Sequence, residues 1–124
     1  MEKSFHYILG KEGEAKAIEY LIAHGYDIIT TNYSCHFGEI DVIAREGKSL
    51  CFIEIKTRAG SQFGFPAEAI SRRKQKKLIT TARFYMHEYR TKFDEHRFDI
   101  VEVLYRKESD YFDFSLIKDA FEVF

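Results

Sequence analysis

The sequence predicts one α/β domain in which helices pack against a central sheet, in the order α-β-β-β-α-β. Three observations support this fold class. The 124 residues fit a single domain, which we place at residues 1–124. Apolar residues recur at helical spacing in two segments and alternate with other residues in several more. A content of 45% hydrophobic and 31% charged residues is that of an ordinary globular protein, which excludes a fibrous or disordered chain.

The first predicted helix runs from about Phe5 to His24, where Gly25 is a natural stop. Its apolar stripe has helical spacing and comprises Ala17, Ile18, Leu21 and Ile22. Glu14 falls on the same face as this stripe. We therefore expect its carboxylate to lie at the edge of the core or to be held there for a purpose.

The second predicted helix begins at Pro66 or Ser71 and ends near Arg90. Its buried stripe is expected to comprise Leu78, Ala82, Tyr85, Met86 and Tyr89. The first half reads SRRKQKK, and cationic residues in a first helical turn oppose the helix dipole. We infer that this charge serves another purpose, such as contact with a polyanion.

Five segments are expected to be strands because β-branched and aromatic residues are frequent in them and alternate along them. They are Tyr26–Tyr33, Phe37–Arg45, Lys48–Thr57, Arg97–Tyr105 and, at a sheet edge, Tyr111–Ile117. Glu46 and Gly47 should form the turn of a hairpin between the second and third of these strands. Residues 118–124 are expected to end the chain in a helical turn.

Charge is unevenly distributed along the chain. The segment from Lys56 to Lys92 has ten basic and two acidic residues, a net charge of +8, so the remainder carries −9 of the total −1. A basic face indicates a polyanionic partner such as DNA, and a solvated helix face is the alternative. The residues expected to contact nucleic acid are Arg58, Arg72, Arg73, Lys74, Gln75 and Lys77.

The two cysteines, Cys35 and Cys51, have no spacing that suits zinc. Cys51 lies in an apolar run, so we expect a buried free thiol and a reducing compartment. The first residues contain charges and no apolar signal core, and no run of eighteen apolar residues occurs. We therefore expect a cytoplasmic protein with no membrane partner.

The predicted hairpin brings together Asp41, Glu54 and Lys56. A four-residue turn would place Asp41 directly opposite Glu54, and a two-residue turn would place it opposite Phe52, a diagonal neighbour. A one- or three-residue turn would separate them. An ion-paired surface patch is the alternative, but Phe52 and Ile43 share this face, where charges are costly unless they are paired or bind a metal.

These residue types suit phosphodiester hydrolysis. Two neighbouring carboxylates bind Mg²⁺ or Mn²⁺, which polarises a phosphoryl oxygen and lowers the pKa of bound water. A lysine beside the metal can orient or deprotonate the water and stabilise the developing charge. The sequence therefore predicts a metal-dependent nuclease with Asp41 and Glu54 as metal ligands and Lys56 as a catalytic residue.

The pattern D-x(12)-E-x-K formed by Asp41, Glu54 and Lys56 resembles that of the PD-(D/E)xK nucleases, which have the restriction-endonuclease-like fold. A wider set of motifs resembles the YraN family, small bacterial proteins related to archaeal Holliday-junction resolvases. These motifs, from about Gly10 to Val103, are Gly13-Glu14-x-x-Ala17, Gly38-Glu39-Ile40-Asp41, Phe52-Ile53-Glu54-Ile55-Lys56-Thr57-Arg58, Phe63-Gly64-x-Pro66, Lys74 and Arg97-Phe98-Asp99.

The resemblance implies a restriction-endonuclease-like core with a mixed central sheet flanked by helices. It also implies that Glu14 completes the metal site and that Lys74 or Gln75 positions the substrate. The function that follows is a Mg²⁺-dependent endonuclease acting on DNA, with branched or junction DNA as the candidate substrate.

Cutting both strands of a junction needs two sites, which predicts a homodimer. Apolar residues near the C-terminus could pair the subunits, and core packing is the alternative for them. These residues are Phe114, Leu116, Phe121 and Phe124.

Two other functions stay open on the sequence. One is a nucleic-acid-binding module that retains the nuclease fold, has little activity of its own and acts with an unidentified protein partner. The other is a structural or interaction protein with an incidental hairpin patch, which would show no salt-dependent DNA binding.

Overall fold

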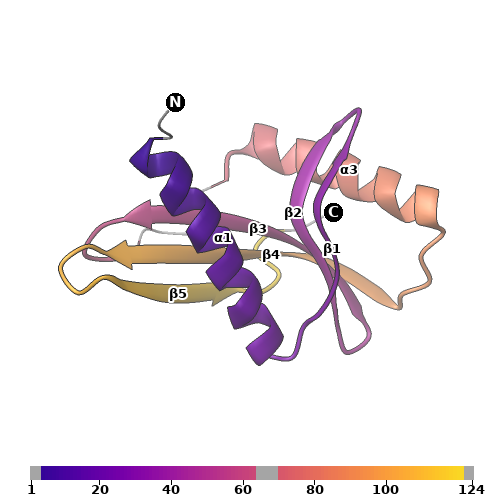
Figure 1. The fold of residues 1–124 in the computed structure, drawn as a ribbon. Coiled ribbons are helices and arrows are strands. Elements are labelled where there is room, and N and C mark those ends of the chain that lie inside the picture. The colour runs from indigo at the N-terminus through magenta and orange to yellow at the C-terminus, as the bar shows by residue number, and fades with distance from the viewer. Residues whose placement is uncertain (1–3, 64–69, 122–124) are drawn as a thin grey trace.

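The computed structural model describes residues 4–63 and 70–121 and confirms the predicted α/β fold (Figure 1). Its elements are α1 (Phe5–Ala23), β1 (Asp27–Cys35), β2 (Gly38–Glu46), β3 (Ser49–Ala59), α3 (Arg72–Tyr89), β4 (Glu95–Arg106) and β5 (Tyr111–Ile117). The strands form one sheet in the order β1-β2-β3-β4-β5. Only β3 and β4 are parallel among the pairs described, so the sheet is mixed.

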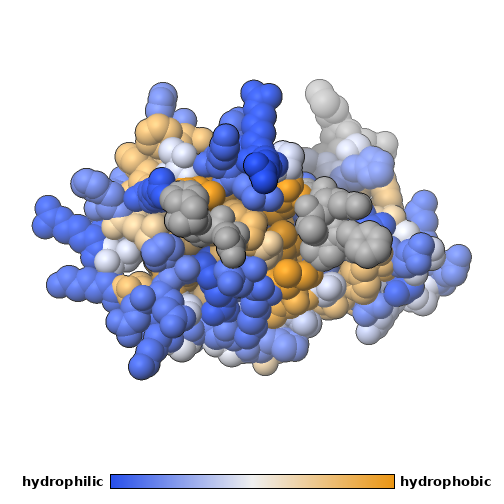
Figure 2. Space-filling model, turned by 180° about the vertical axis from the view of Figure 1, so that it is seen from behind, coloured by the Kyte–Doolittle hydropathy of each residue, from blue (hydrophilic) through white to orange (hydrophobic). Residues whose placement is uncertain are grey.

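The helices α1 and α3 cover opposite faces of the sheet, and a separate hydrophobic core lies under each of them. On the α1 face, Ala17 and Leu21 pack against buried strand residues such as Val42 and Ile53. On the α3 face, Leu78, Ala82 and Tyr85 belong to the cluster of Ile43, Leu50 and Phe52. Figure 1 shows α1 in front of the sheet and α3 behind it. Seen from behind, Figure 2 shows mostly hydrophilic residues around a hydrophobic band near the centre of this face.

Both helices begin at a serine. The Ser4 Oγ accepts a hydrogen bond from the Tyr7 N–H, and the Ser71 Oγ accepts one from the Lys74 N–H, both at 3.2 Å. Such caps satisfy N–H groups that have no partner within the helix. Of the two predicted starts of the second helix, Ser71 is therefore the N-cap, and Pro66 lies outside the described residues.

Three sequence expectations are wrong at the ends of elements. Ile22 and Tyr89 were expected in buried stripes and are exposed. The buried face of α1 follows a narrow line of residues four apart (Leu9, Gly13, Ala17 and Leu21), which leaves Ile22 outside it. The predicted terminal helical turn is absent from its described part, residues 118–121, where the Ala120 N–H donates to the Phe98 carbonyl instead.

The hairpin of β2 and β3 turns one residue later than predicted. Glu46 pairs with Ser49, so Gly47 and Lys48 form the turn. Gly47 has φ of 59°, a left-handed conformation that glycine adopts without steric cost. Described pairing extends to Val42 opposite Ile53, and continuing the register by one pair places Asp41 opposite Glu54. This pairing was expected only of a four-residue turn around Glu46 and Gly47, whereas the structure reaches it with a two-residue turn at Gly47 and Lys48.

Beyond that pair, β2 leaves β3 and continues with β1 toward α3 (Figure 1). Regular alternation breaks at the same place, because Ile40 and Ile43 both belong to the α3-side core while Val42 belongs to the α1-side core. Asn32, across from this point on β1, has φ of 53°, which bends the strand. The bend leaves Asp41 where the two strands separate.

No helix in the described ranges is long and apolar enough to cross a membrane. Both cysteines are free, and Cys51 is buried as predicted.

Gly13 allows α1 to approach β3 closely. A Cβ at this position would lie 2.3 Å from the Thr57 Oγ1, whereas a Cβ at Gly10, one turn earlier, would meet nothing within 4 Å. We expect Gly13→Ala to lower the free energy of unfolding by about 1–3 kcal/mol through overpacking. Gly10→Ala, the matched control, should leave it unchanged or raise it by up to about 1 kcal/mol. Urea unfolding measures both, and equal stability of the two variants would contradict this packing.

Candidate functional site

Two carboxylates meet where β2 separates from β3. Asp41 lies on β2 and is half-buried, and Glu54 lies on β3 and is 6% exposed. The Ile55 N–H donates a hydrogen bond of 2.7 Å to the Asp41 Oδ2. Since the described ladder of the two strands ends at Val42 and Ile53, this carboxylate satisfies a main-chain donor just beyond it. The strands therefore hold the Asp41 side chain against β3.

Glu54 has a cationic partner from the first turn of α3. The Lys74 Nζ lies 2.7 Å from the Glu54 Oε2, and the Lys74 side chain is 46% exposed. A buried carboxylate is costly without such a partner. The hydrogen bond to Glu54 raises the pKa of Lys74, so the ammonium keeps its charge at neutral pH. The structure thus directs Lys74 toward the site, as the sequence predicts for this residue.

Asp41 is in an environment that disfavours its charge. Burial raises the pKa of Asp41 to about 7, and the hydrogen bond and negative charge of Glu54 contribute next. The Ile55 N–H acts in the opposite direction, and the more distant charge of Glu14 raises the pKa further. The three predicted acids therefore influence one another, with the strongest coupling between Asp41 and Glu54.

Asp41 also faces a pocket of about 400 Å³ between α1 and β3. Its lining comprises His6, Tyr7, Gly10, Lys11, Glu14, Asp41, Ile55, Lys56 and Thr57. The pocket thus brings Lys56 and Glu14 together with Asp41, whereas Glu54 points to α3. Sequence reasoning missed His6, Tyr7 and Lys11, because only the packing of α1 across β3 brings them here. The glycine at position 13 is the one local signal of that close packing.

The donor set fits a magnesium ion held by two carboxylates. In residues 4–63 and 70–121, no three His, Cys, Asp or Glu side chains are grouped closely enough to hold a metal. Glu14 is therefore near Asp41 without forming a three-carboxylate cluster with it and Glu54. Mg²⁺ commonly binds through one or two carboxylates and completes its shell with water and substrate phosphate. The crowded negative charge at Asp41 and Glu54 is what a divalent cation would offset.

Arg58 and Gln75 make contacts within the protein. The Arg58 Nε donates to the Oε1 of buried Glu102 at 3.0 Å, and the Gln75 Nε2 donates to the Ile70 carbonyl at 3.1 Å. The other residues expected to contact nucleic acid, Arg72, Arg73 and Lys77, are exposed on the first turns of α3.

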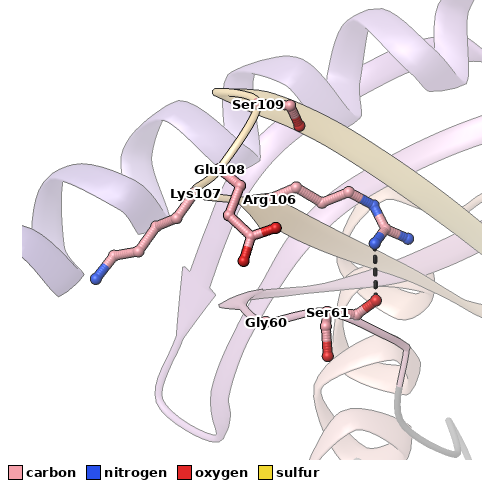
Figure 3. A pocket seen from close by; sticks show the side chains of 6 residues that line it. All are labelled: Gly60, Ser61, Arg106, Lys107, Glu108 and Ser109. Atoms are coloured by element: carbon pink, nitrogen blue, oxygen red, sulfur yellow. Dashed lines mark hydrogen bonds between the residues drawn. The ribbon is translucent and has the colours of Figure 1, made fainter.

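Another pocket, of about 420 Å³, lies beyond the end of β3 (Figure 3). It is lined by Gly60, Ser61 and residues 106–109, and the Arg106 Nη1 donates to the Ser61 carbonyl at 2.7 Å. Arg106 also pairs with Asp113 at 3.0 Å. None of the predicted catalytic residues lines this pocket, so we assign Arg106 to holding the segment after β3.

A buried network fixes the hairpin at the end away from the carboxylates. The Arg97 Nε lies 2.9 Å from the Asp99 Oδ1, and the two side chains form an ion pair. The Tyr26 hydroxyl donates to the Asp99 Oδ2 at 2.9 Å, and Arg97 also pairs with Glu46 at the hairpin turn. These contacts join β4 to the turn of the hairpin, so we assign Arg97 and Asp99 a structural role.

The chain is similar to a set of bacterial proteins that share one family name. A family model described as "Uncharacterised protein family UPF0102" matches residues 13–103. A UPF0102 protein of Caldicellulosiruptor saccharolyticus is 42% identical over 91% of this chain and 96% of its own. One of Clostridium tetani is 38% identical over 97% and 98%, and one of Chlorobium phaeobacteroides is 41% identical over 94% of each chain. These names state no activity.

The raised pKa of Asp41 has a consequence for stability. Asp41 binds a proton more tightly in the folded protein than in the unfolded chain, where the ordinary pKa of about 4 applies. From about pH 4 to 7 the folded state holds more protons, so the free energy of unfolding falls as pH rises. We expect Asp41→Asn to raise the free energy of unfolding by about 1–3 kcal/mol above pH 7, and we expect this increase to disappear near pH 4.

Urea unfolding across this pH range measures the effect. Asp27→Asn is the matched control, because exposed Asp27 pairs with Arg45 at 2.7 Å and should gain nothing on neutralisation. An Asp41→Asn variant no more stable than the wild type above pH 7 would contradict the electrostatics described for the site.

Proposed function

The chain belongs to the uncharacterised protein family UPF0102, and from its fold and its paired carboxylates we propose that it is a divalent-metal-dependent nuclease that hydrolyses phosphodiester bonds of DNA. This family is the YraN family, so the resemblance found in the sequence motifs is confirmed. The activity, the metal and the substrate are our proposals.

One observation carries the proposal, the convergence of Asp41 and Glu54 at the point where β2 leaves β3. Glu54 is buried and Asp41 is half-buried, and burial, together with the hydrogen bond and charge of Glu54, raises the pKa of Asp41 to about 7. A purely structural patch would pair each acid with its own base. Here one ammonium, that of Lys74, contacts Glu54, and Asp41 contacts a main-chain N–H. Such a pair is suited to a divalent cation.

The proposed mechanism assigns a role to each residue. Asp41 and Glu54 would hold Mg²⁺ or Mn²⁺, which when bound polarises the phosphoryl oxygen and lowers the pKa of water. Lys56, which lines the pocket with Asp41, donates hydrogen bonds to the phosphate oxygens as they gain charge and orients the attacking water. The water oxygen forms a bond to phosphorus and gives up a proton to solvent, the bond to the leaving sugar oxygen breaks, and that oxygen takes up a proton from solvent.

The basic helix supports a polyanionic substrate. From Arg72 to Lys77, α3 has five basic residues and no acidic one, and Lys74 reaches from this segment to Glu54. A phosphate backbone lying along α3 would therefore run next to the carboxylates. This favours DNA as the substrate, with branched or junction DNA as the specific proposal and a homodimer as the form that cuts two strands.

The alternative function is a nucleic-acid-binding module that retains the fold without cutting. The observation that favours it is the Lys74–Glu54 contact, because an internal ammonium already neutralises the buried carboxylate. In that case Lys74 would serve the stability of the fold, and activity would depend on a protein partner.

Cleavage of a labelled substrate panel tests the proposal. The panel comprises linear duplex, single strand, flap and four-way junction, each with Mg²⁺ or Mn²⁺. We expect the wild type to cut at least one substrate and Lys56→Ala to lose about 100-fold or more of that rate. Lys48→Ala is the matched control, because Lys48 is exposed at the turn of the same hairpin. A wild type that cuts nothing would contradict the nuclease and favour the binding module.

Metal affinity tests the role of Lys74 without any cleavage. A cation bound by Glu54 must compete with the Lys74 ammonium, so Lys74→Met should tighten Mn²⁺ binding by about twofold to tenfold. Lys77→Met removes the same charge one turn further on, away from Glu54, and should change the affinity less. Electron paramagnetic resonance counts free Mn²⁺ directly. Weaker Mn²⁺ binding by Lys74→Met would contradict the competition.

A further inference from the structure

A cleft separates the tip of the β1–β2 hairpin from the first half of α3. Its volume is about 500 Å³, and its lining includes His36, Phe37 and Glu39 of the hairpin and Lys74, Lys77 and Leu78 of the helix. It shares no lining residue with the pocket at Asp41. Because Lys74 also contacts Glu54, the cleft opens directly beside the candidate site.

Phe37 lines this cleft, and the ring of Phe84 on α3 contacts that of Phe37. Phe37 is 45% and Phe84 is 37% exposed, and their ring centroids are 5.6 Å apart. Next to Phe37, the backbone at Gly38 lies close to α3, because a Cβ at residue 38 would lie 3.0 Å from the Thr81 Oγ1. A single exposed phenylalanine is common on protein surfaces. Here the two rings come from separate elements and their planes are inclined by 60°, so they form an angled aromatic platform on which a base can stack against one ring beside the other.

A basic residue of α3 lies on the same face of the helix as Phe84. Lys77 and Phe84 are seven residues apart on α3, about two helical turns, so they share one face of the helix. Glu39 is the acidic residue of the cleft lining, which also includes Lys74 and Lys77 of the basic segment Arg72–Lys77. Aromatic rings beside basic side chains are the combination that binds single-stranded nucleic acid, with bases on the rings and phosphates on the cations.

We propose that this cleft binds unpaired nucleotides, with a base stacked on Phe37 and flanked by Phe84, and with the adjoining phosphate held by Lys77. The inference rests on the proposed function and narrows its substrate class. A continuous duplex keeps its bases stacked inside the helix and offers none to the rings. The substrate is therefore DNA in which a single-stranded segment adjoins the bond at Asp41 and Glu54, such as a flap or a branch.

The absence of tryptophan from the sequence gives a direct test. Phe37→Trp places the protein's only tryptophan on the platform, where stacking of a base should quench its fluorescence. The titration uses oligothymidylate and a duplex of equal length, with a chelator present so that nothing is cut. We expect quenching with the single strand and little with the duplex. Tyr111→Trp, on β5 at the opposite edge of the sheet, is the matched control and should stay unquenched.

Affinity gives a second readout on a variant with a smaller side chain. Phe37→Ala should weaken binding of oligothymidylate about tenfold in fluorescence anisotropy and leave duplex binding unchanged. Circular dichroism checks that the variant folds, as expected for a change at an exposed ring.

The outcomes separate this inference from the nuclease proposal. Oligothymidylate that binds without quenching at Phe37→Trp, or equal quenching by duplex, would overturn the inference and leave the nuclease standing. Quenching by the single strand in a protein that cuts no substrate would support the inference and overturn the nuclease. Failure to bind any nucleic acid would overturn both.

Discussion

The pairing of β2 with β3, and the residue at which it ends, is the constraint on which the site depends. The turn at Gly47 and Lys48 sets the register, and its last described pair is Val42 with Ile53. Asp41 and Glu54 come next and lie where the strands part. A slip of one residue would send the two carboxylates to opposite faces of the sheet. The Ile55 N–H, bound to Asp41, holds the acid at this point.

The helices α1 and α3 then bring further charged groups to the carboxylates of the hairpin. From one face α3 brings the Lys74 ammonium to buried Glu54, and from the other α1 brings Glu14 toward Asp41 and walls the pocket that Lys56 lines. The close approach of α1 depends on the missing side chain at Gly13. The site is thus assembled from both layers of the fold, and burial together with the nearby Glu54 raises the pKa of the Asp41 carboxyl to about 7.

Local patterns in the sequence predict most of the fold and the chemical residues of the site. The helices, the strands and Ser71 as a helix start follow from spacing and turn chemistry, whereas the pairing of Asp41 with Glu54 depends on a turn that the sequence placed one residue too early. The contacts that long side chains make cannot be predicted from such local patterns, because these contacts depend on tertiary packing. The excess of basic residues suggested that Arg58 contacts nucleic acid. It did not predict the ion pair of Arg58 with buried Glu102, which the parallel register of β3 and β4 brings together. Only the bend at Asn32 and Asp41 brings the hairpin tip, with Phe37, to α3.

Asp41 and Glu54 together are proposed to be the ligands of a divalent cation. The most direct measurement is a crystal structure of the protein soaked with Mn²⁺, in which anomalous scattering locates the metal. We expect one strong anomalous peak between the Asp41 and Glu54 carboxylates, with Lys74 moved away from Glu54. Clear density for both acids with the Lys74 contact intact, and with no peak between them, would contradict this proposal.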